Sequence, residues 1–395
     1  PIFIGLMYLV FQLTFMLGEY PMGWLENFFA FAAGFLTAHW PGDPGGPLQS
    51  LVVDGIIGGV GGVIVFLPNI LLLFLAIAIL EDTGYMARAA FIMDHIMHKI
   101  GLHGKSFIPM LIGFGCSVPA IMATRILENR RNRITTIMVI PLMSCGARFP
   151  IYMMIIPAFF AAKYEGLVLC LIYFIGIAIA VICAKLLRST LLAGETIPFV
   201  MELPPYRAPT VRGVLIHMWS RGWMYVKKAG TIILCISIII WAATTYPKTG
   251  AGALAGLDAG EARTEQLKNS VVGQIGGKLA PALEPLGFDW RISTSLVGAF
   301  AAKEVFVSQM GIMYSVGDAD EDSEALRARL KADYTPLQGF CIMLFCLISM
   351  PCVATIAMTK QETGLWRWAM LQLVGLTALA YIITLAVYQI GTLIT

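Results

Sequence analysis

Charged side chains are scarce in this sequence. Only 13% of its 395 residues are Asp, Glu, Lys or Arg, whereas 58% are hydrophobic. Soluble globular domains carry roughly twice that share of charge, so the composition excludes them and indicates an integral membrane protein. The net charge of +3 is what Lys and Arg residues beside membrane segments give any such protein, and it implies no nucleic-acid partner.

Motifs of several other classes are also missing. The eight cysteines lack the paired spacing of a disulfide framework or a zinc ribbon. The run G-K-S at 104–106 resembles the end of a Walker A motif, but the glycine required five positions earlier is Lys99, which excludes a nucleotide site. No intramembrane Asp pair, Ser-His pair or His-Glu zinc group supports a protease. The spacing His95-x-x-His98 fits a solvated helix better than a metal site.

Long apolar runs fill most of the chain. Several approach or exceed the ~20 residues that cross a bilayer, namely 2–17, 56–80, 167–187, 231–246 and 371–394. We therefore predict an all-α polytopic membrane protein built as a helical bundle in contact with membrane lipid. The segment 18–49 has no Lys or Arg and is expected on the outer side, whereas 188–228 is basic and is expected in the cytoplasm. The chain begins at Pro1 without a signal peptide, so we expect a piece of a longer protein.

Three apolar segments carry helix-breaking residues. Residues 107–124 contain Gly113, Gly115 and Pro119, residues 134–162 contain Gly146 beside Cys145, and residues 340–358 contain S-M-P-C. Hydrocarbon cannot satisfy the backbone groups that such breaks expose, so broken helices are tolerated only where they are buried in protein or line a cavity. Basic residues flank 107–124 on both sides, which predicts a re-entrant hairpin that enters from the cytoplasm.

Two of these segments share a short motif. S-V-P-A-I-M-A-T at 117–124 is similar to S-M-P-C-V-A-T at 349–355, and the topology makes the surrounding units inverted. We predict two inverted gate repeats with broken or re-entrant helices, as in many secondary transporters. The predicted parts are a first helix and outer segment (1–50), gate module 1 (51–187), a cytoplasmic loop with an interfacial helix at 211–226 (188–228), and gate module 2 (229–395) with an outer loop (247–291).

Sulfur donors lie at the breaks. Cys116, Cys145 and Cys352 each stand beside a Pro or Gly, and the plain interpretation for any one of them is packing as a small apolar residue. Together they indicate a path for a softer or borderline transition metal. Further candidate donors are Met143, Met350, Ser117, Ser144 and the carboxylates Glu81, Asp82 and Glu304. Glu304 has an alternative role in an ion pair with Lys303, Arg88 or Arg148, because buried charges are usually paired.

Five long motifs resemble the membrane part of the ferrous-iron transporter B (FeoB) family. They are L-E-D-T-G-Y-M-A-R-A-A-F-I-M-D (80–94), G-L-H-G-K-S-F-I-P (101–109), G-F-G-C-S-V-P-A-I-M-A-T-R (113–125), M-S-C-G-A-R-F-P-I-Y (143–152) and K-E-V-F-V-S (303–308). The resemblance implies Fe(II) uptake across the bacterial inner membrane through two gate modules, with a cysteine path carried by Cys116, Cys145 and Cys352.

The same resemblance implies partners outside this chain. The family has an N-terminal GTP-binding domain that these residues do not contain, so GTP is expected only on that domain, joined in cis or acting in trans. The resemblance is also compatible with small accessory Feo proteins as partners and with a homo-oligomer. Fe(II) is expected as transported substrate and no cofactor as permanently bound, which makes the chain a transporter and not an enzyme.

Two other functions stay open at this point. A nucleoside/cation symporter with similar hairpins would carry amide side chains at both hairpin tips, where this sequence has few. A receptor or scaffold for a separate GTPase domain would conduct no ion. A gated channel and an alternating-access carrier both fit the sequence.

Overall fold

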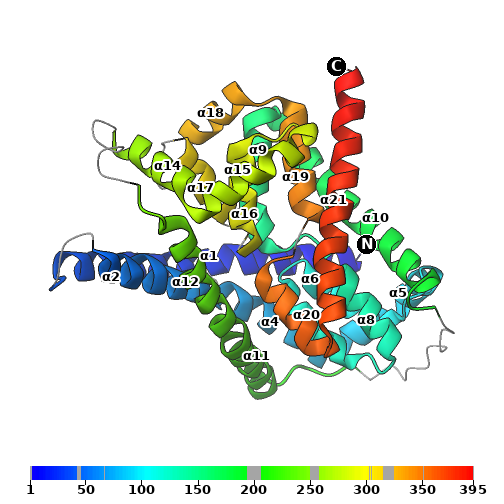
Figure 1. The fold of residues 1–395 in the computed structure, drawn as a ribbon. Helices are drawn as coiled ribbons and strands as arrows, with labels where there is room; N and C mark the ends of the chain where they lie inside the picture. Colours follow the sequence, from blue (N-terminus) through cyan, green and yellow to red (C-terminus); the bar gives the residue numbers. More distant parts are fainter. Residues whose placement is uncertain are drawn as a thin grey trace. The chain divides into compact units, whose positions relative to one another are not determined.

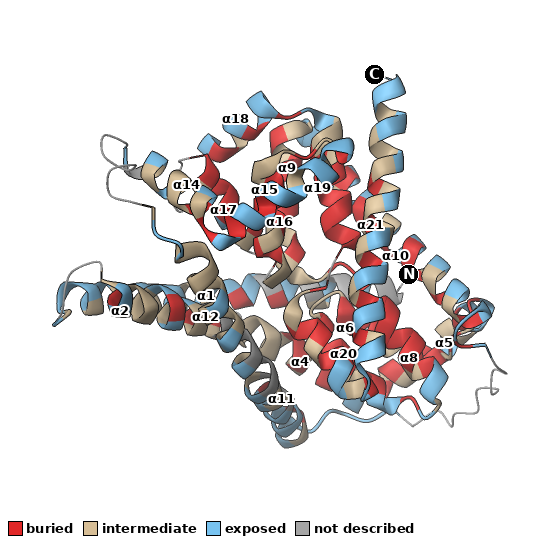
Figure 2. Cartoon of the chain, in the orientation of Figure 1, coloured by how far each residue is buried: buried red, intermediate tan, exposed pale blue. Residues whose placement is uncertain are grey.

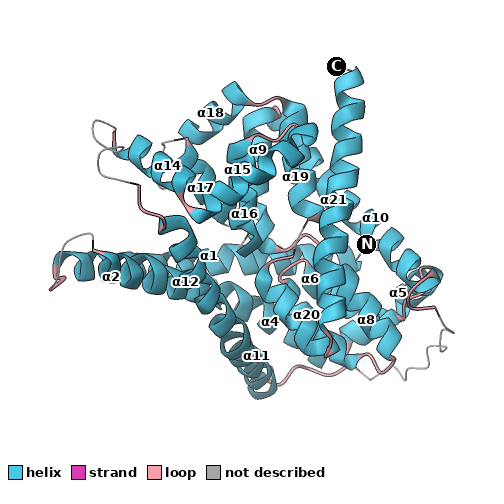
Figure 3. Cartoon of the chain, in the orientation of Figure 1, coloured by secondary structure: helices cyan, strands magenta, loops and turns pink. Residues whose placement is uncertain are grey.

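The computed structural model describes residues 2–41, 46–65, 67–193, 206–249, 258–301, 303, 305–314, 324–349 and 351–394. Within these residues the secondary structure is helical, with turns between helices and no strand (Figure 3). Figure 1 shows the helices of the chain with their labels. Contacts divide the chain into two compact units: unit 1 comprises Pro1–Ile140 and Val181–Ile238, and unit 2 comprises Pro141–Ala180 and Ile239–Thr395. These units interleave along the sequence and differ from the predicted gate modules, whose bounds stay a prediction.

Four helical stretches of the described chain are long and apolar enough to cross a membrane: Arg130–Phe159, Ala162–Ser189, Pro336–Thr363 and Trp366–Ile394. A fifth would be the pair Leu67–Asp82 and Tyr85–Lys99, whose axes differ by 83°. The protein therefore has the all-α polytopic membrane fold that the composition indicated.

Unit 1 begins with one long helix. Its α-helices are α1 (Ile2–Ala38), α2 (Pro47–Ser50), α3 (Gly58–Val65), α4 (Leu67–Asp82), α5 (Tyr85–Lys99), α6 (Phe107–Gly113), α7 (Ser117–Ala123), α8 (Arg130–Val139) and α11 (Val211–Tyr225). Shorter 3-10 or π turns are η1 (Leu51–Ile57), η2 (Gly104–Ser106), η3 (Thr124–Ile126), η4 (Ile140–Leu142) and η7 (Val226–Gly230). Helices α10 (Glu165–Ser189) and α12 (Thr231–Thr245) each contribute residues to both units.

The expected end of the first helix at residue 17 is wrong. Helix α1 continues through Gly18 and Pro21 to Ala38, so these two residues do not end it. Helix α1 packs on α3 and α4. The glycine run at 58–62 permits close helix contacts, as predicted: a Cβ on Gly59 would lie 2.6 Å from Ser237 Cβ, and one on Gly61 would lie 3.2 Å from Phe29 Cγ.

The break predicted in 107–124 is present at residues 114–116, between α6 and α7. Pro119 does not interrupt the helix, since it lies in the first turn of α7, where its missing N–H removes no intrahelical bond. The predicted helix at 211–226 also exists as α11 and packs along α4.

Unit 2 contains the remaining elements. They are η5 (Gly146–Arg148), α9 (Phe149–Phe159), η6 (Ala162–Tyr164), α14 (Ala259–Asn269), α15 (Val271–Leu283), η8 (Glu284–Leu286), α16 (Trp290–Ala301), α17 (Val305–Met313), α18 (Glu324–Asp333), α19 (Pro336–Ile348), α20 (Val353–Thr363) and α21 (Trp366–Ile394). Buried residues concentrate on α9, α16, α17 and α19 (Figure 2). Helix α21 packs along α19 and α20.

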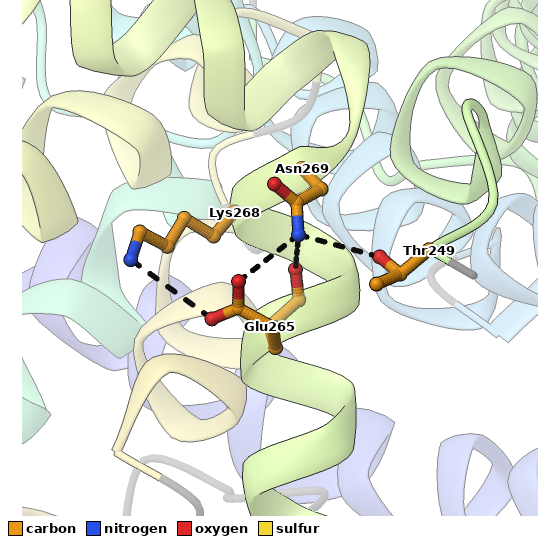
Figure 4. Close-up of polar contacts among 4 residues, drawn as sticks. All are labelled: Thr249, Glu265, Lys268 and Asn269. Atoms are coloured by element: carbon orange, nitrogen blue, oxygen red, sulfur yellow. Dashed lines mark hydrogen bonds and ion pairs between the residues drawn. The ribbon is translucent and has the colours of Figure 1, made fainter. Parts of the chain in front are cut away.

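The segment 247–291, which was expected on the outer side and carried no secondary-structure assignment, contains α14, α15 and η8. Asn269 Nδ2 donates to Thr249 Oγ1 at 3.4 Å, to Glu265 O at 3.0 Å and to Glu265 Oε1 at 3.0 Å (Figure 4). Lys268 Nζ lies 3.9 Å from Glu265 Oε2. These contacts fasten the chain after α12 to α14.

Helices α16 and α17 fold back on each other. They pack together, and a Cβ on Gly298 would lie 2.5 Å from Cδ and Nε2 of Gln309. These two positions lie on opposite sides of the turn at residue 303, five residues before it and six after it, which is the pattern of a helical hairpin. The sequence had left open whether this segment crosses fully or returns, and the structure shows that it returns.

Candidate functional site

The three cysteines at the breaks all precede helices. Cys116 is the N-cap of α7, Cys145 the N-cap of η5, which leads into α9, and Cys352 the N-cap of α20. All three are partly exposed. In contrast, Cys341 and Cys346 are buried within continuous helix α19. Cys170 and Cys235 are exposed and Cys183 is partly exposed within helices α10 and α12, so exposure alone does not separate the cysteines at the breaks from those in continuous helix.

Unit 2 brings two of these cysteines together. Cys145 lies close enough to Cys352 to interact with it electrostatically. Cys352 precedes α20, which packs on α16. Cys145 precedes η5 and α9, and α9 packs on α17. Cys352 Sγ is also 3.1 Å from Thr355 Oγ1. This cluster of unit 2, comprising Cys145, Cys352 and Thr355, is the candidate site.

Two buried cations adjoin the candidate site. Lys303, at the turn of the α16–α17 hairpin, is 3% exposed, and Arg148 in η5 is 2% exposed. Lys303 interacts electrostatically with Cys145, Cys352, Cys346 and Arg148. Positive charge of this kind stabilises thiolates, as does the N-terminal end of a helix. Burial of a thiol opposes its ionisation, and these cations offset part of that cost.

Arg148 also shapes the break that precedes it. Its Nη1 donates to the carbonyl oxygen of Met143 at 3.3 Å, closing the residues 143–148 into a compact turn. Ser144 Oγ and Tyr152 Oη are 3.1 Å apart and hydrogen-bond within the same region. Met143 and Ser144 are nearly fully buried. The turn thus fixes the backbone on both sides of Cys145.

The other predicted donors have separate surroundings. Ser117 is buried in the first turn of α7 in unit 1. Glu81 and Asp82 are exposed at the end of α4, and Asp82 Oδ2 accepts a hydrogen bond from the Thr210 amide at 3.0 Å. Glu304 and Met350 lie outside the described residues. Among the described residues, no group of three or more His, Cys, Asp or Glu side chains is placed to hold a metal ion.

Comparison with known protein families gives two matches. A family model described as nucleoside-recognition gate matches residues 63–159 and 226–366, more than half of the chain. A second, described as the C terminus of ferrous iron transport protein B, matches residues 169–221. The chain belongs to the FeoB family.

Relatives of FeoB type match nearly the whole chain. A Fe(2+) transport protein A/Fe(2+) transporter FeoB fusion protein of Porphyromonas gingivalis is 45% identical over 100% of this chain and 50% of its own length. The Fe(2+) transporter FeoB of Campylobacter jejuni is 44% identical over 97% of this chain and 62% of its own length. The Fe(2+) transporter FeoB of Helicobacter pylori is 40% identical over 98% of this chain and 63% of its own length. The chain thus spans half to less than two thirds of these FeoB relatives. No solved structure matches it.

Sequence reasoning on this FeoB chain missed part of the site. Thr355 lies inside the motif S-M-P-C-V-A-T, so its place near a cysteine break was a usable signal. Tyr152 follows the break at 143–148, but no pattern in the sequence paired it with Ser144. Arg148 was considered as an ion-pair partner of Glu304, and the structure adds that it donates a hydrogen bond to the Met143 carbonyl.

Proposed function

We propose that this chain is the membrane part of a ferrous-iron transporter, through which Fe(II) crosses the bacterial inner membrane. The observation that carries the proposal is the cluster of Cys145 and Cys352 at two helix breaks of unit 2, in a chain whose relatives are named Fe(2+) transporters. Softer sulfur donors suit Fe(II) better than Mg²⁺ or Ca²⁺. The relatives' names favour iron over a nucleoside as substrate.

In this proposal unit 2 provides a transient metal site. Cys145 and Cys352 bind Fe(II) as thiolates, with Thr355, Met143 and Ser144 close by as further donors. Lys303 and Arg148 balance the thiolate charge while the site is empty of metal, and they oppose the positive charge of an arriving ion. Binding strong enough to select and weak enough to release is what a conduction site requires.

Unit 1 contributes its own candidate ligand. Cys116 and Ser117 lie at the start of α7 and are proposed as a separate point of contact for the ion, and Glu81 as a carboxylate near its exit. We further propose that nucleotide binding belongs to a G domain outside this chain, in cis or in trans, and that a small accessory protein assists it. The name of the Porphyromonas gingivalis relative, a transport protein A fusion, supports the last point.

Anaerobic Fe(II) uptake into proteoliposomes tests the proposal. Full-length protein is compared with Cys145→Ser, Cys352→Ser and Cys116→Ser, and Cys170→Ser is the matched control because Cys170 is exposed on continuous helix α10. We expect each of the first three to lose at least about tenfold in uptake at low Fe(II), since even outer-shell changes cost 10–100-fold in metal affinity. Equal uptake by all variants would refute the cysteine path.

A further inference from the structure

The turn between α4 and α5, here called the elbow (residues 81–85), is held in a defined shape. Gly84 has φ +77°, a conformation that favours glycine. The Gly84 amide donates to the Glu81 carbonyl at 3.0 Å, and Thr83 Oγ1 donates to the Leu80 carbonyl at 3.0 Å. Leu80, Met86 and Leu111 form a buried cluster against it. The elbow is therefore a firm platform that displays the side chains of Asp82 and Arg88.

Residues 206–210, far along the chain, contact the elbow. The Thr210 amide donates to Asp82 Oδ2 at 3.0 Å, across 128 residues of sequence. Arg88 Cζ lies 3.5 Å from the centroid of the Tyr206 ring, a close cation–π contact. Arg88 Nη1 also donates to the Gly84 carbonyl at 3.1 Å, so the guanidinium is held in place by the elbow itself.

The contact falls at the start of a helix. Thr210 is the N-cap of α11, and its side chain makes no capping hydrogen bond. Asp82 supplies the carboxylate that the positive end of this helix favours. Helix α11 continues through η7 into α12, and α12 runs past Ile238, where the residues of unit 2 begin. A change in the hydrogen bonding of Thr210 therefore acts at the N-terminal end of the continuous helix formed by α11, η7 and α12.

We propose that Asp82, Arg88 and Tyr206 are positioning residues that form a reversible latch between the elbow and the start of α11. Fe(II) leaving past the elbow competes with the Thr210 amide for the Asp82 carboxylate and so opens the latch. This second part depends on the proposed function, whereas the latch itself does not. Asp82 and Thr210 are exposed, and the Tyr206 side chain is 65% exposed. Exposed contacts of this kind are weak enough to open and close.

Hydrogen exchange on the full-length protein tests the latch without transport. Asp82→Asn keeps an oxygen that can accept from Thr210, Asp82→Ala removes it, and Thr210→Pro removes the amide donor together with the threonine side chain. We expect exchange in the first turns of α11 to quicken about three- to tenfold in Asp82→Ala and Thr210→Pro, and to stay near the wild-type rate in Asp82→Asn. Unchanged exchange in Asp82→Ala and Thr210→Pro would overturn the latch.

Fe(II) then tests the competition. Under anaerobic conditions, added Fe(II) should quicken exchange at the start of α11 in the wild type and leave Asp82→Asn unaffected. In uptake assays, Asp82→Ala and Thr210→Pro should change transport in the same direction. Unchanged exchange at the start of α11 in the wild type after addition of Fe(II) would overturn the competition. If wild-type protein takes up no Fe(II), the proposed function fails while the exchange rates without metal still decide the latch.

Discussion

The α16–α17 hairpin carries Lys303 to the candidate site, and its packing depends on Gly298. A Cβ at this position would lie 2.5 Å from both Cδ and Nε2 of Gln309. The Gln309 side chain is only 3% exposed, so it is enclosed by protein and cannot move aside into solvent. Gly298→Ala should therefore behave as an overpacked core and lower the free energy of unfolding by about 1–3 kcal/mol.

Denaturant unfolding in detergent micelles measures this change, with two further variants as controls. Gly277→Ala lies in α15 with nothing within 4 Å of the added Cβ, and it should stabilise the protein by about 0.5–1 kcal/mol. The double variant Gly298→Ala/Gln309→Ala removes the amide that the new methyl would meet, so it should recover most of the lost stability. Additive effects of the two single substitutions would refute the packing of the hairpin described here.

Three other predictions concern stability. Burial lowers the pKa of His103 from its ordinary value of 6.5, and protonation would also remove the Nδ1 acceptor of the Lys105 amide at 3.2 Å. The folded protein should therefore lose thermal stability as the pH falls below about 6.5, and His103→Asn, which keeps a capping acceptor but cannot be protonated, should reduce that loss. Thr359→Val removes the 2.7 Å hydrogen bond to Gln372 between α20 and α21 and should cost about 1–3 kcal/mol in denaturant unfolding. Cys341→Ala should cost about 1 kcal/mol by cavity formation yet leave Fe(II) uptake unchanged, whereas loss of uptake would make Cys341 more than a packing residue.

Composition and residue type were enough to predict the membrane class and the position of the breaks. Gly113, Gly115, Gly146 and Pro351 lie at or beside these breaks, whereas Pro21 and Pro119 lie within helices. The terminal helix α21 followed from length and apolar character. The sequence motif that suggested the repeat falls in different settings: residues 117–124 form α7 and the following turn, whereas 349–355 contain the break between α19 and α20.

Other features depended on contacts between distant residues. Asp82 stood out as a candidate metal ligand, but only the fold shows Thr210 at its carboxylate, because no local pattern relates positions 128 residues apart. The return of α17 on α16 likewise rests on Gly298 meeting Gln309. Helix α1 was cut short at residue 17 because the residues after it are more polar and aromatic than the apolar run before it, although the helix includes them up to Ala38.

The central claim is that Cys145 and Cys352 bind one metal ion together. Anaerobic titration of the full-length protein with Co(II) tests it most directly, since thiolate-to-cobalt charge-transfer absorbance reports sulfur ligation. Co(II) stands next to Fe(II) in divalent affinity order. The account predicts this absorbance in wild type and Cys170→Ser, and at least about tenfold weaker Co(II) binding in both Cys145→Ser and Cys352→Ser. Identical titrations for all four proteins would contradict it.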